Sequence, residues 1–146
     1  MTLILAPRTA IIDADHARVG AWMHANGAGR WREGVTCIGL ERDGELVAAM
    51  MFDHYNGASI FAHIAITGRL SKDWVHRVCH YPFIQLGCQV VIGLVSEKNV
   101  ASQRLAEHSG FVRGLAIPDA DPSGALLIYT LTKDDCRVIR RPYYVI

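Results

Sequence analysis

The sequence predicts a mixed α/β fold, in which one sheet of antiparallel and parallel strands carries helices on its faces. Three neighbouring stretches with a two-residue apolar period, joined by tight-turn residues, span 35–67 and predict an antiparallel meander. A strongly apolar stretch at 89–95 then lies between two stretches of helical period, at 71–86 and 100–109. A strand–helix–strand crossover that follows a meander makes the sheet mixed.

One strand and one helix are predicted ahead of the meander. The apolar residues 2–6 indicate a short strand that Pro7 stops. Residues 15–26 have a helical period, and Asp13 or Asp15 can cap the first turn of this helix. A loop at 28–34 leads to the meander, whose strands are predicted at 35–41, 46–52 and 59–67, with turns at 42–45 and 54–58.

The second half of the chain carries the crossover. Ser71 is a suitable cap for the helix at its start, and Pro82 predicts a kink or break within that helix. The strand at 89–95 is apolar enough to be buried on both faces. Asn99 can cap the next helix, and Gly110 suits its left-handed end. The last predicted elements are a strand at 111–117, a polar loop at 118–124 and a strand at 125–132.

Composition bounds the class of protein. At 146 residues, the chain is predicted to form one domain over 1–146. A net charge of +1 gives no general attraction to nucleic acid or to an anionic membrane. No apolar run reaches the roughly 20 residues of a membrane span, and residues 1–8 lack the basic lead of a signal peptide. The four cysteines have no CxxC spacing and are expected to be reduced thiols, so a cytoplasmic location is expected.

Residues 95–111 carry the most specific pattern in the chain. In this segment Asn99 opens a helix, Leu105 lies midway along it, and Gly110-Phe111 begins the next strand. The segment resembles the strand-to-helix region of the GNAT superfamily of N-acetyltransferases. An Asn cap and a Gly-Phe exit suit any strand–helix–strand unit, so the element order is what joins them to this family.

The resemblance extends over roughly residues 35–137. The segments 81–87 and 128–137 are similar to a short, phage- and prophage-associated branch of the superfamily. The resemblance implies a GNAT fold and transfer of an acetyl group from acetyl-CoA to an amine. The acceptor stays open between a small molecule, a protein and a nucleobase. No metal and no membrane partner are expected, and the chain is expected to be a monomer or a homodimer.

The family binds its coenzyme in a V-shaped opening between two central strands, here 59–67 and 89–95. The resemblance implies that a backbone N–H near Ile64, Ala65 or Ile66 serves the thioester carbonyl oxygen. The pyrophosphate is expected at the start of the following helix. Only one glycine stands there in place of the family's paired glycines. The residues that this assigns to the coenzyme are Ile64, Ala65, Ile66, Gly68, Arg69, Ser71, Lys72, Asn99 and Arg104.

His63 is the candidate general base. Strand alternation places His63 on one face of its strand and the aliphatic side chains on the other face. A histidine also suits proton removal near neutral pH. A hydrogen-bonded structural histidine is an equally good explanation. Many family members place a tyrosine where this chain has Ala106, so Tyr81, Tyr129, His108 or water is left as the general acid, with Tyr81 the candidate side chain.

Two other functions compete with acetyl transfer. His76 and His80 stand four apart on a predicted helix, but no third ligand is indicated, so solvent-facing histidines are expected rather than a metal site. A catalytically inactive GNAT-like fold that binds a protein or nucleic acid would explain the missing glycines and the missing tyrosine together. The basic, aromatic segment 137–144 would then supply a contact surface.

Overall fold

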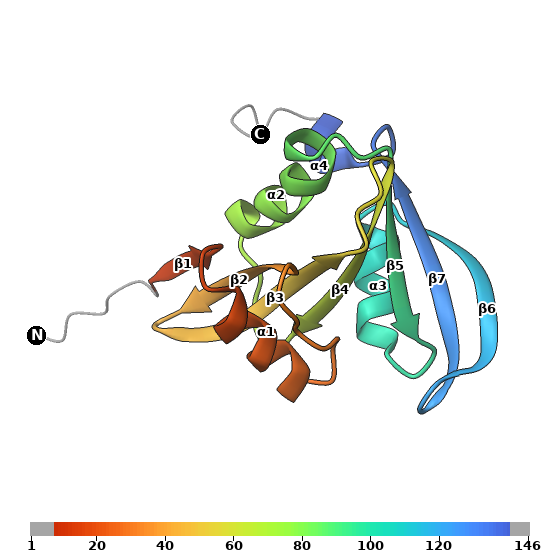
Figure 1. Ribbon diagram of the computed structural model, residues 1–146, viewed down its shortest axis with the longest axis horizontal. Coiled ribbons are helices and arrows are strands. Elements are labelled where there is room, and N and C mark those ends of the chain that lie inside the picture. The colour runs from red at the N-terminus through yellow and green to blue at the C-terminus, as the bar shows by residue number, and fades with distance from the viewer. Residues whose placement is uncertain (1–7, 141–146) are drawn as a thin grey trace, which may run out of the picture.

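The computed structural model describes residues 8–140 and is organised around a seven-stranded mixed sheet (Figure 1). The strand order is β1-β2-β3-β4-β5-β7-β6, and β4 and β5 form the one parallel pair among the described strands. The predicted meander and crossover are therefore confirmed. The strands are β1 (Thr9–Ile12), β2 (Thr36–Arg42), β3 (Glu45–Asp53), β4 (Ser59–Ile66), β5 (Val90–Ser96), β6 (Val112–Asp121) and β7 (Gly124–Thr132).

Helices cover both faces of the sheet between β2 and β4. The helices of the described residues are α1 (His16–Ala25), α2 (Lys72–His80), the π-helical turn η1 (Tyr81–Gln85), α3 (Val100–His108) and α4 (Arg137–Arg140), of which α3 contacts β5 and β6 instead. α1 packs on one face through Val19 and Met23, which contact a buried cluster that includes Met51 and Ala65. α2 and η1 pack on the other face, where Trp74 is buried.

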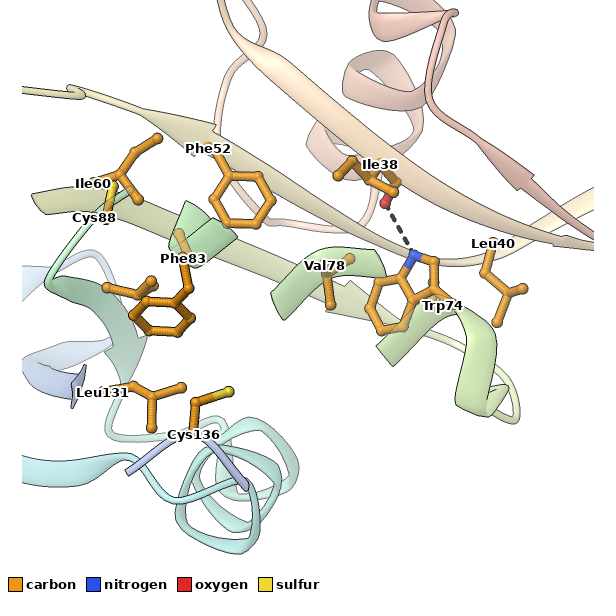
Figure 2. Packing of buried hydrophobic residues seen from close by; sticks show 13 residues of the cluster. Ile38, Leu40, Phe52, Ile60, Trp74, Val78, Phe83, Cys88, Leu131 and Cys136 are labelled. Atoms are coloured by element: carbon orange, nitrogen blue, oxygen red, sulfur yellow. Dashed lines mark hydrogen bonds between the residues drawn. The ribbon is translucent and has the colours of Figure 1, made fainter. Parts of the chain in front are cut away.

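The core beneath α2 is shown in Figure 2. Trp74 is 1% exposed, and its indole Nε1 donates a hydrogen bond to the Ile38 carbonyl at 3.1 Å. Phe83 lies in the same cluster. An indole that is buried must pair its N–H, and here the β2 backbone accepts it. This contact fixes α2 over β2.

The predicted caps and turns are found at most positions. The side chains of Asp15, Ser71 and Asn99 each accept a hydrogen bond from a backbone N–H in the first turn of their helices. Asp43 and Gly44 have φ values of 53° and 83°, which suit the two-residue turn of a twisted hairpin. At Pro82 the chain does not break, since the helix continues as the wider π turn of η1.

Four expectations need correction or fall outside the described residues. The strand predicted at 2–6 lies outside them, and the first strand is β1, which was not predicted because its four residues gain their pairing only from β2. β5 is not buried on both faces; its side chains alternate between buried and half-buried. The polar loop predicted at 118–124 is wrong, because β6 continues to Asp121 and pairs with β7. Residues 141–144 of the basic segment are likewise outside the described range.

Candidate active site

A cleft opens in the sheet where β4 and β5 part. The two strands pair only from Ser59 opposite Val90 to Ala62 opposite Gly93, although both continue beyond these residues. The resulting cleft has a volume of about 520 Å³. It is lined by residues 26–29 of the α1–β2 loop, residues 63–67 of β4 and its end, residues 94–96 of β5, and Asn99, Ala101, Ser102, Asp121 and Leu126.

Backbone groups of β4 face into the cleft. The Thr67 N–H donates to the Val47 carbonyl of β3 at 2.8 Å, so the odd-numbered residues of β4 direct their backbone groups toward β3. The Ala58 carbonyl accepts from the Gln89 N–H at 2.7 Å, which agrees that the even-numbered residues face β5. The N–H groups of Ile64 and Ile66 therefore point toward β5, which has diverged from β4 at this level. The backbone of Ala65 faces β3.

His63 lies on the wall of the cleft beside a carboxylate. Met51 is opposite His63 and Asp53 is opposite Phe61, so Asp53 and His63 are diagonal neighbours on the same face of the sheet. The His63 Nε2 lies 3.2 Å from Asp53 Oδ1. The Asp53 side chain is 7% exposed, and it also contacts His54 Nδ1 at 3.2 Å and Arg32 Nη2 at 3.3 Å.

This environment keeps Asp53 ionised and sets the tautomer of His63. Burial tends to raise the pKa of Asp53, but hydrogen bonds from His54 and His63 and their charges outweigh it and lower the pKa below its ordinary value. An ionised carboxylate only accepts hydrogen bonds, so the Nε2 of His63 must carry the proton in this contact. The Nδ1 of neutral His63 therefore holds the free lone pair.

The N-terminus of α3 forms the opposite side of the cleft. The Asn99 side chain accepts a hydrogen bond from the Ser102 N–H at 3.1 Å, and Asn99, Ala101 and Ser102 all line the cleft. The first N–H groups of a helix favour an anionic group through their partial positive charge. The Asp121 carboxylate borders the same cleft from the β6–β7 hairpin, and hydrogen bonds from the Ser123 hydroxyl and N–H lower its pKa.

The predicted pyrophosphate residues are not brought to the cleft. Gly68, Arg69, Ser71 and Lys72 do not line it, and α2 begins over β2 instead. The Gly68 N–H donates to the Val47 carbonyl at 3.1 Å, and the Arg69 carbonyl accepts from Arg42 at 2.7 Å. Ser71 caps α2 through the Trp74 N–H. Of these groups, the Gly68 N–H is occupied within the fold, and the pyrophosphate position at the start of α2 stays a prediction.

The candidate acids also lie away from the cleft. Tyr81 packs on the α2 face of the sheet and donates to the Thr36 hydroxyl at 3.0 Å, whereas His63 lies on the α1 face. The Tyr129 hydroxyl is held by Glu107 at 3.2 Å, and burial together with this carboxylate raises the pKa of Tyr129. Ala106 and Tyr129 line an apolar cavity of about 70 Å³ beneath α3, which adjoins the cleft through shared residues such as Ile64 and Val95. Arg104 and His108 are exposed on α3 outside the cleft.

Three parts of the site were missed from the sequence. They are Asp53, Arg32 and the 26–29 loop that lines the cleft. Asp53 falls between the strand predicted at 46–52 and the turn predicted at 54–58, and its contact with His63 depends on the strand register. Gly29 has a φ of 68°, and it packs against Met51 and His63. Nothing in the sequence except the glycines of this loop indicated that Gly29 borders the cleft.

His76 and His80 stack on α2 with ring centroids 5.9 Å apart. Within residues 8–140 there is no group of three or more histidine, cysteine, aspartate or glutamate side chains arranged to hold a metal ion. In the same part of the chain, no helix is both long and apolar enough to cross a membrane. Neither histidine of this pair lines the β4–β5 cleft.

Comparison of the sequence with protein-family models gives no match, and comparison with curated proteins also gives none. The fold does have clear relatives among solved structures, and these define it as the fold of the GNAT acetyltransferases. The yncA structure from Salmonella typhimurium, solved with its cofactor acetyl-CoA, has a TM-score of 0.65 and 16% identity. That alignment covers 88% of this chain and 96% of the other.

Two structures of the spermidine acetyltransferase SpeG from Vibrio cholerae are also similar. Mutant forms of this spermidine/spermine N-acetyltransferase align with a TM-score of 0.69 and 12% identity, over 87% of this chain and 96% of the other. A dodecameric form of the spermidine enzyme aligns with a TM-score of 0.68 and 12% identity, over 86% and 94% of the two chains. At these identities the comparison establishes the fold, and the site must be argued from its own residues.

Proposed function

We propose that this protein is an acetyl-CoA-dependent N-acetyltransferase that acts on the amine of an acceptor. The observation that carries the proposal is the cleft between β4 and β5, which presents unpaired β4 backbone groups and has His63 on its wall. A cleft through a sheet leaves buried backbone groups that need a partner. An extended chain of amides, such as the pantetheine arm of coenzyme A, meets that need.

The residues of the cleft fit such a coenzyme in part. Acetyl-CoA supplies a thioester, whose acyl carbon is open to attack by a neutral amine. The N–H groups of Ile64 and Ile66 point into the gap and are suited to donate to a carbonyl oxygen as negative charge develops on it. The start of α3 offers the N–H groups of Val100 and Ala101 as a second position for a phosphate, beside Gly68 to Lys72. The N–H groups of Asn99 and Ser102 are instead paired with the Ser96 carbonyl and the Asn99 side chain.

His63 is proposed to remove the proton of the acceptor amine. Its Nδ1 holds the lone pair, because Nε2 is directed at Asp53. In the transfer, the amine nitrogen forms a bond to the acyl carbon while the carbon–sulfur bond breaks. The amine proton passes to His63, and the leaving thiolate takes a proton from water. The ionised Asp121 at the edge of the cleft favours a cationic acceptor.

The remaining parts of the proposal rest on the resemblance in sequence. We extend it to one domain over 1–146, a cytoplasmic location and membership of the phage-associated branch. The acceptor is proposed to be an amine of a small molecule, a protein or a nucleobase. Of these, the carboxylate at the cleft supports an acceptor that carries positive charge.

Calorimetric titration of the purified protein with acetyl-CoA, beside dephospho-coenzyme A, tests the coenzyme site. Micromolar binding of acetyl-CoA that weakens without the 3′-phosphate supports a working cleft, and an amine and peptide acceptor screen then follows. Lys72→Ala and Val100→Pro distinguish the two phosphate positions, because a proline at the first position of α3 removes a backbone N–H and is tolerated there. Loss of affinity in Lys72→Ala alone would return the anion site to the start of α2.

A second function is favoured by one observation. In the loop that the family uses for pyrophosphate, the N–H groups of Thr67 and Gly68 are both paired with the Val47 carbonyl of β3, which would weaken coenzyme binding. Weak coenzyme binding is what we expect of a non-catalytic binding module, a catalytically inactive GNAT-like fold that binds a protein or nucleic acid. No heat of binding at about millimolar acetyl-CoA, with the protein folded, would reject the acetyltransferase and support this module.

A further inference from the structure

The side of β5, β7 and β6 opposite α3 forms a second feature, which we call the bare face. On β5, burial alternates strictly, so that Val91, Gly93 and Val95 are buried while Ile92 and Leu94 are half-buried. The same alternation continues on β7. The register joins these half-buried residues into one surface with β6. The paired residues of the bare face are Ile92, Leu94, Leu126, Ile128, Thr130, Val112 and Ile117. Leu115 precedes Ala116, whose partner Leu127 is buried on the α3 side, so strand alternation places Leu115 on the bare face as well.

This surface is uncharged and apolar apart from the exposed Thr130, which lies between Ile92 and Val112. The β6 side chains Val112, Leu115 and Ile117 are 60%, 68% and 38% exposed. None of the side chains of the bare face is ionisable, and the acidic residues of β6, Asp119 and Asp121, lie at its hairpin end. Contiguous apolar surface of this kind marks an interaction site when it is not covered within the chain.

No helix within residues 8–140 covers the bare face. α1 contacts β2 and β3 on that side of the sheet, and α3 contacts β5 and β6 from the other side. Figure 1 shows α1 in front of the β2–β4 part of the sheet and no helix in front of β7 and β6. The face is therefore left open by the described fold.

We propose that a second copy of this chain covers the bare face in solution, as a two-fold dimer with the two sheets packed face to face. Nucleic acid would require basic side chains, which the face lacks, and an uncharged apolar surface matches an equally uncharged one. In a two-fold dimer the same patch meets itself, so the face is its own complementary surface. Homodimer interfaces are also the most apolar class.

Packing through the face is favoured over pairing through the β6 edge. The register of β6 shifts between Arg113 and Ala116 and again between Ile117 and Asp121. Pro118 lacks an N–H, and proline and bulges on an edge strand oppose pairing with another strand. Leu94 and Leu126 belong both to the bare face and to the lining of the cleft, so a partner seated there borders the site.

The oligomeric state tests this inference. Sedimentation velocity of the purified chain from about 1 µM to about 100 µM is expected to show a monomer–dimer equilibrium or a dimer throughout. The double variant Leu115→Glu, Ile117→Lys is expected to be monomeric over this range. Ile84→Glu is the matched control, because Ile84 is 47% exposed on η1 and not on the bare face, and it should remain dimeric.

Circular dichroism shows whether the double variant is folded. If it is not, Leu115→Ala is the substitute, and it should raise the dimer dissociation constant at least about tenfold. A monomeric wild type at about 100 µM overturns the proposal, as does a folded double variant that still dimerises. The readout is mass and not coenzyme binding, so its failure is separate from failure of the acetyltransferase proposal.

Discussion

The two halves of the sheet differ in how they are covered. Between β2 and β4, α1 lies on one face and α2 on the other, and β3 is buried at most positions along its length. Between β5 and β6, α3 covers one face and the bare face is left open. Helices therefore cover both faces of the sheet in the first half, and only one face in the second.

The cleft lies where these halves meet. β2 and β3 pair from Thr36 to Arg42, whereas β4 and β5 pair over only four positions. Where the pairing stops, backbone groups that would be satisfied in a continuous sheet are left for another partner. We therefore expect side chains in the covered half to determine the stability of the fold. Residues at the β4–β5 cleft and on the bare face are expected to determine binding. The following predictions test that division.

Trp74→Ala should have the largest effect on stability. Its indole is buried in the covered half, and removal of a buried tryptophan costs about 3 to 5 kcal/mol of unfolding free energy. Leu115→Ala, on the bare face, should change the stability of the monomer by less than about 0.5 kcal/mol. Urea unfolding at low protein concentration measures both. Similar losses in the two variants would remove the distinction between the halves.

His63→Ala should have the largest effect on turnover. Loss of a general base lowers the rate by about 100-fold to 10,000-fold, while affinity for acetyl-CoA should stay nearly unchanged. Initial rates with an identified acceptor, beside calorimetric titration, separate the two quantities. Ser59→Ala removes a side-chain hydroxyl from the same face of β4 outside the Asp53–His63 contact, and serves as the control. Unchanged turnover across pH would exclude His63 as the base.

Asn99→Ala should have a moderate effect on both stability and coenzyme affinity. An N-cap substitution costs about 1 kcal/mol, and this cap also lines the cleft. Asp15→Ala removes the equivalent cap of α1 away from α3, so it should cost similar stability with no loss of coenzyme affinity. Thermal unfolding and calorimetry give the comparison. If both variants bind acetyl-CoA equally well, the start of α3 is not the anion site.

Asp53→Asn should have the smallest effect, and one that depends on pH. The pKa of Asp53 is lowered in the fold, so its carboxylate adds stability above its ordinary pKa, near pH 4, and this is lost as pH falls through the lowered value. The gap in unfolding free energy between wild type and Asp53→Asn should therefore shrink on acidification from pH 6 to about pH 3. A constant gap would show that Asp53 acts by packing alone.

The strand alternation on β4 was visible in the sequence, and it led to His63 on the wall of the cleft. Asp53 was not, because its contact with His63 is diagonal between two strands and depends on their register. The phosphate position stays a prediction for a similar reason. Helix caps at Ser71 and Asn99 look alike in sequence, and only the tertiary structure shows that the helix after Ser71 packs over β2 and that Asn99 lines the cleft.

Local chemistry in the sequence determined the elements: the hairpin turns, the caps of α1, α2 and α3, and the change of period that separates meander from crossover. Each of these depends on a few neighbouring residues, so sequence carries it. Only the tertiary structure decided where β4 and β5 part, which helix begins at the cleft, and which face stays uncovered. Those features depend on how far strand pairing extends and where each helix packs, and both are settled by contacts between residues distant in the chain.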